Sequence, residues 1–137
     1  MIFAPLAVLL AQAINPEPTG LLRSDDTNYW LPGAKLVAMV ERRLGVPDRM
    51  GGPLSNFNRY YTGLYRNGHR VLFLELSKFG ALPAGSGKVQ VVPPAQVPHI
   101  IHGGCDIIRF SYDVDARQES SLDCNFDPPP PPPQPHQ

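Results

Sequence analysis

Gly-Gly-Cys-Asp-Ile-Ile-Arg-Phe-Ser-Tyr-Asp-Val-Asp, residues 103–115, is the stretch of this sequence that decides the fold. Apolar side chains occupy every second position from 108 to 114, and polar or charged side chains occupy the positions between them. A period of two is typical of a β-strand with one buried face. The β-branched and aromatic residues in the stretch favour the same structure.

A second alternation follows a turn near residues 116–117, with Leu122, Cys124 and Phe126 on one face. Aligning the apolar faces of the two strands places Tyr112 opposite Ser120 and Ile108 opposite Cys124. The sequence therefore predicts an antiparallel hairpin that closes the domain.

The chain has two cysteines, Cys105 and Cys124, one on each strand of this hairpin. We predict that they form a disulfide, which would close a loop of about 20 residues and contribute roughly 3 kcal/mol. Straight pairing would leave their Cα atoms beyond the usual limit of about 7 Å. A bulge at residues 107–108 or a bend at residues 103–104 would bring Cys105 back toward Cys124.

Residues 1–13 form an apolar run that ends in Ala-Gln-Ala, the small-x-small pattern of a signal-peptide cleavage site. The run is too short to span a bilayer as a helix, and it lacks a basic start. The alternative is a hydrophobic strand or helix of a cytosolic protein. We expect a signal peptide, no membrane span after its cleavage, and a periplasmic or secreted domain, in keeping with a disulfide.

The 137 residues fit one domain, which we place at residues 29–127 after a polar linker at residues 14–28. Residues 128–137 form a proline-rich tail that we expect to be disordered and extended. The formal net charge is zero and no basic run occurs, which argues against nucleic acid as a partner.

One helix is expected after residue 33, because apolar residues recur at three- and four-residue spacing from Leu36 to Leu44. Gly45 and Pro47 indicate where it ends. Its single apolar stripe requires a sheet to cover.

Asn67-Gly68 lies between two β-rich runs and predicts a tight hairpin. The turn sets Leu64 opposite Val71, and it sets Gly63 opposite Leu72 with room for the helix to lie against the sheet. The second run is apolar on both faces from residue 71 to 74, which indicates a central strand.

A short strand at residues 88–92 and an irregular proline-containing connection at residues 93–104 precede the last hairpin. The order is thus one helix followed by about five strands, all reachable by antiparallel connections. We predict an α+β fold with an N-terminal helix packed on an antiparallel sheet, similar to cystatin-like folds.

His99, His102 and Cys105 follow a three-residue spacing and are the one cluster with metal-ligand side chains. Two imidazoles and a thiolate could hold zinc, and a histidine could activate Cys105 as a nucleophile. Both alternatives require a free thiol, which the expected disulfide removes, so we assign no metal ligand and no catalytic residue.

Tyr60, Tyr61 and Tyr65 lie on the first strand of the Asn-Gly hairpin. Aromatic residues on a sheet usually pack in the core, but three together could also form a binding surface for a peptide or a glycan.

Several of these segments resemble a group of small exported proteobacterial proteins of uncharacterised function, over about residues 59–126. The resemblance rests on Arg-Tyr-Tyr-Thr-Gly at 59–63, Gly-His-Arg-Val at 68–71, Gly-Gly-Cys at 103–105 and Leu-Asp-Cys-Asn at 122–125. It implies a periplasmic, disulfide-bonded domain and supplies no activity or site residue. The proline-rich tail and His102 depart from the pattern.

The sequence favours a small exported, non-enzymatic binding or interaction domain, such as an inhibitor or accessory factor, with a protein or peptide partner in the cell envelope and no cofactor. One alternative is a metal-dependent or hydrolytic enzyme that uses the loop of His99, His102 and Cys105. The other is a protein whose proline tail docks into an aromatic-lined groove.

Overall fold

The computed structural model describes residues 27–79, 87–98, 100–125, 133 and 135. The predicted signal peptide, most of the predicted linker and most of the proline-rich tail lie outside the described residues, as does His99.

The described elements are one α-helix, three short 3₁₀ turns and seven strands. In chain order they are β1 (Tyr29–Trp30), α2 (Ala34–Arg43), η1 (Asp48–Met50), η2 (Leu54–Asn56), β2 (Asn58–Arg66), β3 (His69–Ser77), β4 (Val89–Val91), η3 (Pro94–Gln96), β5 (Gly104–Asp113), β6 (Gln118–Glu119) and β7 (Asp123–Asn125).

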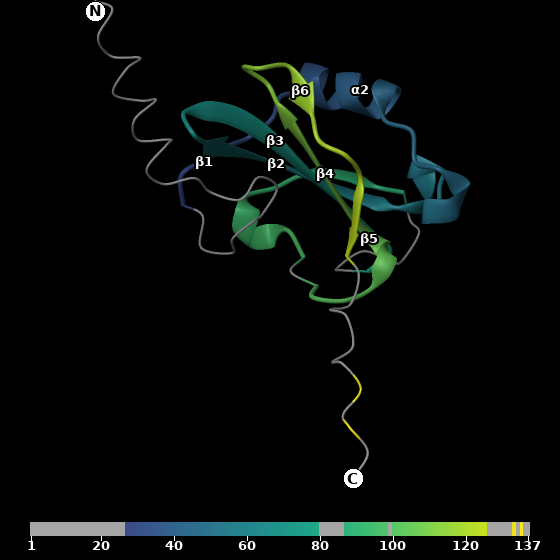
Figure 1. The fold of residues 1–137 in the computed structure, drawn as a ribbon. Coiled ribbons are helices and arrows are strands. Elements are labelled where there is room, and N and C mark those ends of the chain that lie inside the picture. Colours follow the sequence, from purple (N-terminus) through teal and green to yellow (C-terminus); the bar gives the residue numbers. More distant parts are fainter. Residues whose placement is uncertain (1–26, 80–86, 99, 126–132, 134, 136–137) are drawn as a thin grey trace, which may run out of the picture.

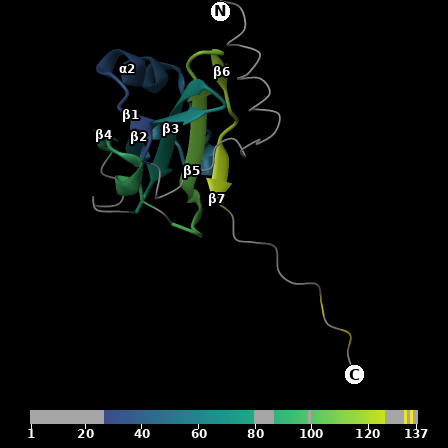
Figure 2. The same cartoon turned by 90° about the vertical axis from the view of Figure 1, so that its left-hand side faces the viewer.

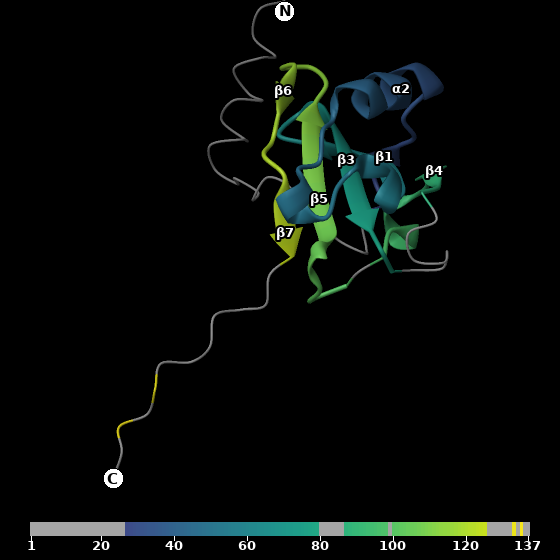
Figure 3. The ribbon, with the colours of Figure 1, turned by 90° about the vertical axis from the view of Figure 1, so that its right-hand side faces the viewer.

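The seven strands form one sheet in the order β1-β2-β3-β5-β6, with β4 beside β2 and β7 beside β5. Strands β1 and β4 both lie beside β2 at one edge, and β6 and β7 both lie beside β5 at the other (Figures 2 and 3). The sheet is therefore five strands wide, as expected. One expectation was wrong: β4 pairs with β2 in parallel rather than antiparallel. Short-range sequence patterns could not show this pairing, because about 30 residues separate the two strands.

Helix α2 covers one face of the sheet, as the apolar stripe predicts (Figure 1). Val37 and Val40 are buried against a continuous core. The core side chains that the three central strands direct to this face are Tyr61, Leu72, Leu74, Leu76, Ile108, Phe110 and Tyr112. The helix ends at Arg43, and the extended backbone of the cap residue Leu44 turns the chain away before Gly45.

The Asn-Gly hairpin forms with the predicted register, including Leu64 opposite Val71 and Gly63 opposite Leu72. Asn67 and Gly68 both have positive φ, as a type I′ turn requires. The space above Gly63 is filled by Trp30 of β1, and not by the helix as expected. A Cβ at Gly63 would lie 2.3 Å from the Trp30 ring, and the Trp30 Nε1–H donates to the Leu64 carbonyl at 2.9 Å.

The disulfide between Cys105 and Cys124 is present, with a Cα–Cα distance of 4.5 Å. Ile108 lies opposite Cys124 as predicted, and the ladder then shifts before Gly104 pairs with Asn125. Gly103 and Gly104 both have positive φ. The bend and the bulge that the sequence required are therefore both used to bring Cys105 to Cys124.

The predicted pairing of Tyr112 with Ser120 was wrong by one residue, since Tyr112 lies opposite Glu119. Ser120 leaves the ladder because its hydroxyl accepts the Ser111 N–H at 2.8 Å, while its own N–H donates to the Ser111 carbonyl at 2.8 Å. The register of β7 against β5 is therefore shifted by one residue relative to the register of β6 against β5.

The face of the sheet opposite α2 is covered by the connection that leads from β4 to β5, residues 92–103. Val92 and Val97 of this connection pack with Tyr60 of β2. Figure 1 shows α2 above the sheet and the green η3 turn below it. The sheet is thus buried on both faces, with an apolar core on the helix side and many polar side chains on the other. Within the part of the chain that the structure describes, no helix is long and apolar enough to cross a bilayer.

Candidate functional site

The predicted histidine and cysteine cluster does not form a site in the described part of the chain. Cys105 is bound to Cys124, and neither cysteine is free. His102 is exposed on the connection, and His99 lies outside the described residues. No group of three potential metal-binding side chains occurs among the residues that the structure describes. Both hypotheses for Cys105, as a thiolate ligand and as a thiolate nucleophile, need a free sulfur, whereas this sulfur is bonded to Cys124.

The three tyrosines do not form a joint surface. Tyr60 and Tyr61 are buried at 3% and 0% exposure, and only Tyr65, at 41%, is open to solvent. Adjacent positions on a strand point to opposite faces, so Tyr61 enters the helix-side core while Tyr60 packs under the connection. The prediction of a shared binding surface does not fit this arrangement.

A hydrogen-bonded cluster of Glu41, Arg59 and Tyr61 fixes the helix to the sheet. The Arg59 Nε and Nη2 donate to Glu41 Oε1 at 3.0 and 2.8 Å, and the Tyr61 hydroxyl donates to Glu41 Oε2 at 2.5 Å. Burial, followed by the hydrogen bond to Glu41, raises the pKa of Tyr61 well above its usual value. The remaining guanidinium nitrogen of Arg59 donates to the carbonyls of Phe57 and Gly87. All these donors and acceptors are satisfied internally, which marks the cluster as structural.

A row of polar side chains crosses the sheet on the face opposite α2. Directly paired residues on neighbouring strands share a face of the sheet. The pairings place five such residues in one line from edge to edge: Gln90, Tyr60, Glu75, Arg109 and Asp123. The sequence pattern did not single out this row, because its members lie on five different strands and become neighbours only through strand pairing.

Glu75 is the unusual member of the row. Glu75 is 1% exposed, and neither of its carboxyl oxygens has a hydrogen-bond partner among the residues that the structure describes. A cation lies at ion-pair distance: Arg109 Nη2 is 3.8 Å from Glu75 Oε1. Burial disfavours the charged form and raises the pKa of Glu75 to about 7, although the Arg109 charge opposes this effect.

Arg109 connects Glu75 to the edge of the sheet. Its guanidinium donates to Asn125 Oδ1 at 3.1 Å and to the Ile100 carbonyl at 3.3 Å. The Asn125 amide in turn donates to the carbonyls of Ile100 and His102, at 2.6 and 3.1 Å. The end of the connection is therefore held against β7 by two side chains.

An open hollow of about 250 Å³ lies on the same face, near the end of β5 beyond Arg109. We call it the edge groove. Its lining consists of Arg66, Val71, Ser111, Asp113, Gln118, Glu119 and Ser120. The lining combines one apolar side chain with hydroxyl, amide, carboxylate and guanidinium groups, so it can both donate and accept hydrogen bonds.

Two hydrogen-bonded pairs hold the walls of the edge groove. Asp113 Oδ2 lies 2.7 Å from His69 Nδ1, and Asp113 Oδ1 accepts the Ala116 N–H at 2.8 Å. The hydrogen bond to Asp113 raises the pKa of His69. Both oxygens of Asp113 are thus engaged, and this carboxylate supports the wall. The neutral polar side chains of the lining are Ser111, Gln118 and Ser120.

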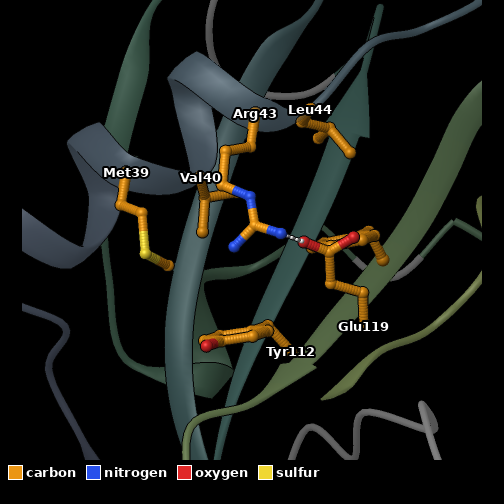
Figure 4. A pocket seen from close by; sticks show the side chains of 7 residues that line it. Met39, Val40, Arg43, Leu44, Tyr112 and Glu119 are labelled. Atoms are coloured by element: carbon orange, nitrogen blue, oxygen red, sulfur yellow. Dashed lines mark ion pairs between the residues drawn. The ribbon is translucent and has the colours of Figure 1, made fainter. Parts of the chain in front are cut away.

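Two other hollows lie elsewhere in the described part of the chain. The one between α2 and the sheet measures about 10 Å³, room for about one water molecule. Figure 4 shows Arg43 and Glu119 meeting across it, with their ion pair at 3.2 Å. The second, about 420 Å³, is an open hollow beside the disulfide, bordered by Arg49 and Met50.

No family model, curated protein or solved structure matches this chain. The α+β architecture with one helix on a largely antiparallel sheet is established by the structure itself. The similarity to cystatin-like folds stays a prediction.

Proposed function

We propose that this chain is a small exported, non-enzymatic binding domain whose edge groove receives an extended peptide segment of a protein in the cell envelope. The observation that supports the proposal is the groove itself. It is an open hollow lined by the apolar Val71 and by hydrogen-bonding groups that include Ser111 and Gln118.

The size of the groove favours a segment of peptide over a whole small molecule. Pockets that enclose a small-molecule ligand usually measure about 300–1,000 Å³ and bury most of it. The edge groove, at about 250 Å³, falls below this range and is open to solvent. It has room for one or two side chains of a longer chain that continues across the surface.

The chemistry of the lining supports the same class of partner. A peptide presents carbonyl and N–H groups along its backbone and needs both donors and acceptors from its receptor. The Gln118 amide supplies both, and the Ser111 hydroxyl can act in either role. The disulfide is in keeping with an oxidising compartment outside the cytoplasm, where such a partner would be met.

Peptide selection on the oxidised protein tests the proposal. A random peptide library displayed on phage is selected against the purified full chain, and the dissociation constants of enriched peptides are measured by fluorescence anisotropy. Gln118→Arg fills the groove with a long side chain and is expected to weaken binding at least about tenfold, a change of ~1.4 kcal/mol.

The matched control is Gln96→Arg, the same substitution at an exposed position of η3 outside the groove lining. It should leave the dissociation constant within about twofold of the native value. Failure to enrich any peptide, or equal effects of the two substitutions, would contradict the proposal.

A further inference from the structure

Glu75 and Arg109 lie next to each other on the polar face of the sheet, too far apart to form a hydrogen bond. Their closest approach of 3.8 Å is an ion-pair distance but exceeds the range of a hydrogen bond. A buried carboxylate with no hydrogen bond is costly, whereas the protonated acid is far less so. The geometry therefore suits a neutral Glu75.

Arg109 has a second set of partners that competes with Glu75. Its guanidinium donates to the Ile100 carbonyl at 3.3 Å and to Asn125 at 3.1 Å, and its side chain is 32% exposed. The bond to Ile100 is long, and that carbonyl also accepts a shorter bond of 2.6 Å from Asn125. A movement of about 1 Å would bring the guanidinium within hydrogen-bond distance of Glu75.

Few other groups can influence this pair. Within the described residues, β2 contributes Tyr60 next to Glu75, and β7 contributes Asp123 opposite Arg109. Gln90 of β4 follows Tyr60 in the row and carries no charge, and the nearby connection contributes the apolar Val92 and Val97. Within the row, all of whose members the structure describes, Arg109 is the one cation and Asp123 is the one other carboxylate. The connection also carries a titratable side chain, the exposed His102.

We propose that Glu75 and Arg109 form a proton-operated latch on the connection between β4 and β5. With Glu75 protonated, Arg109 stays on Ile100 and Asn125 and holds residues 100–104 against β7. When Glu75 loses its proton, the carboxylate draws the guanidinium inward, because a charge-assisted bond to a buried carboxylate is stronger than a bond to a carbonyl. Asn125 alone then retains Ile100, and the connection loosens.

The titration range of Glu75 supports this mechanism. Burial raises the pKa of Glu75 to about 7, so the proton is exchanged near neutral pH. The segment that responds ends at Cys105, so the latch lies beside the disulfide hairpin and apart from the edge groove.

Amide hydrogen exchange of the full oxidised chain between pH 5.5 and 8.5, corrected for intrinsic rates, tests the latch. In the native protein, the protection of residues 100–104 is expected to fall at least about tenfold over this range. In Glu75→Gln, protection should remain at the acidic value at every pH. The control Asp48→Asn, which removes an exposed carboxylate of η1 outside the edge groove, should behave like the native protein. Equal pH dependence in the native protein and Glu75→Gln, or no dependence in either, would overturn the proposal.

A spectroscopic titration keeps the test decisive if Glu75→Gln fails to fold. The ¹³C resonance of the Glu75 carboxyl and the ¹⁵N resonance of Arg109 Nε are followed in the native protein. The latch requires both to shift with one midpoint near 7. A Glu75 carboxyl that titrates near its ordinary value, or an Arg109 resonance that does not follow it, would contradict the latch.

Discussion

Glu75 occupies a position on the central strand where its neighbours along the chain are apolar. Leu74 and Leu76 point to the helix side, while Glu75 points to the opposite face and is just as completely buried. A buried carboxyl group with no hydrogen bond reduces the stability of the folded state whenever it is ionised. Its protonation therefore links the stability of the whole domain to pH.

We predict that the native protein loses stability relative to Glu75→Gln as the pH rises from acid to alkaline values. The folded-state pKa of about 7 exceeds the ordinary value of 4.5, so the folded state binds the proton more tightly than the unfolded state. The resulting stability is fully present below pH 4.5 and is lost as the pH rises through 7. The difference in the free energy of unfolding between the two proteins should fall by roughly 3 kcal/mol over this range.

Urea unfolding of both proteins at a series of pH values measures this difference. Contributions of the other titratable groups cancel to a first approximation, because the two proteins share them. A difference that stays constant with pH would show that the Glu75 carboxyl has an ordinary pKa in the folded protein.

At the scale of the elements, α2 is held by two kinds of contact with the sheet. Val40 is 4% exposed and packs in the core, and Glu41 accepts hydrogen bonds from Arg59 and Tyr61. The side chain of Arg43, in contrast, is 60% exposed and forms an ion pair with Glu119. The two faces of the helix should therefore respond differently to the same substitution.

Val40→Asp is expected to lower the free energy of unfolding by several kcal/mol, because it buries a charge with no partner. Arg43→Asp loses one exposed ion pair and should cost about 1 kcal/mol or less. Thermal unfolding of the two variants compares the effects. Equal losses in melting temperature would show that the helix packs through a different face.

The parts of the fold that the sequence predicted are those that depend on neighbouring residues. The helix, the Asn-Gly hairpin with its register, and the pairing of Ile108 with Cys124 follow from local periodicity and turn chemistry. The one-residue shift at Ser120 escaped prediction, because it depends on a side-chain hydrogen bond to the backbone.

The candidate sites could hardly be predicted from the sequence, because their residues lie far apart in the chain. Glu75 and Arg109 are separated by more than 30 residues, and only the pairing of β3 with β5 makes them neighbours. The same holds for Glu41 and Arg59, which meet through helix packing. The tyrosines were visible as a cluster in the sequence, but strand alternation sends adjacent ones to opposite faces.

At the scale of the whole molecule, the two faces of the sheet differ in chemistry and in cover. The helix closes the apolar face with side-chain packing, whereas the β4–β5 connection covers a face that contains Glu75, Thr62 and Ser77. The disulfide joins the start of β5 to the edge strand β7, next to the residues that hold this connection. Oxidation of the cysteines is thus central to the account, because it fixes the edge on which the polar face depends.

Intact-mass spectrometry of the native protein without reductant tests this claim most directly. We predict that protein from the periplasmic fraction begins at or near Ile14, contains no free thiol, and has a mass lower by the two hydrogens lost in forming the bond between Cys105 and Cys124. Cys105→Ser and Cys124→Ser should then lose similar stability, roughly 2–5 kcal/mol. Protein that retains Met1 in the cytoplasm and contains two titratable thiols would contradict the account.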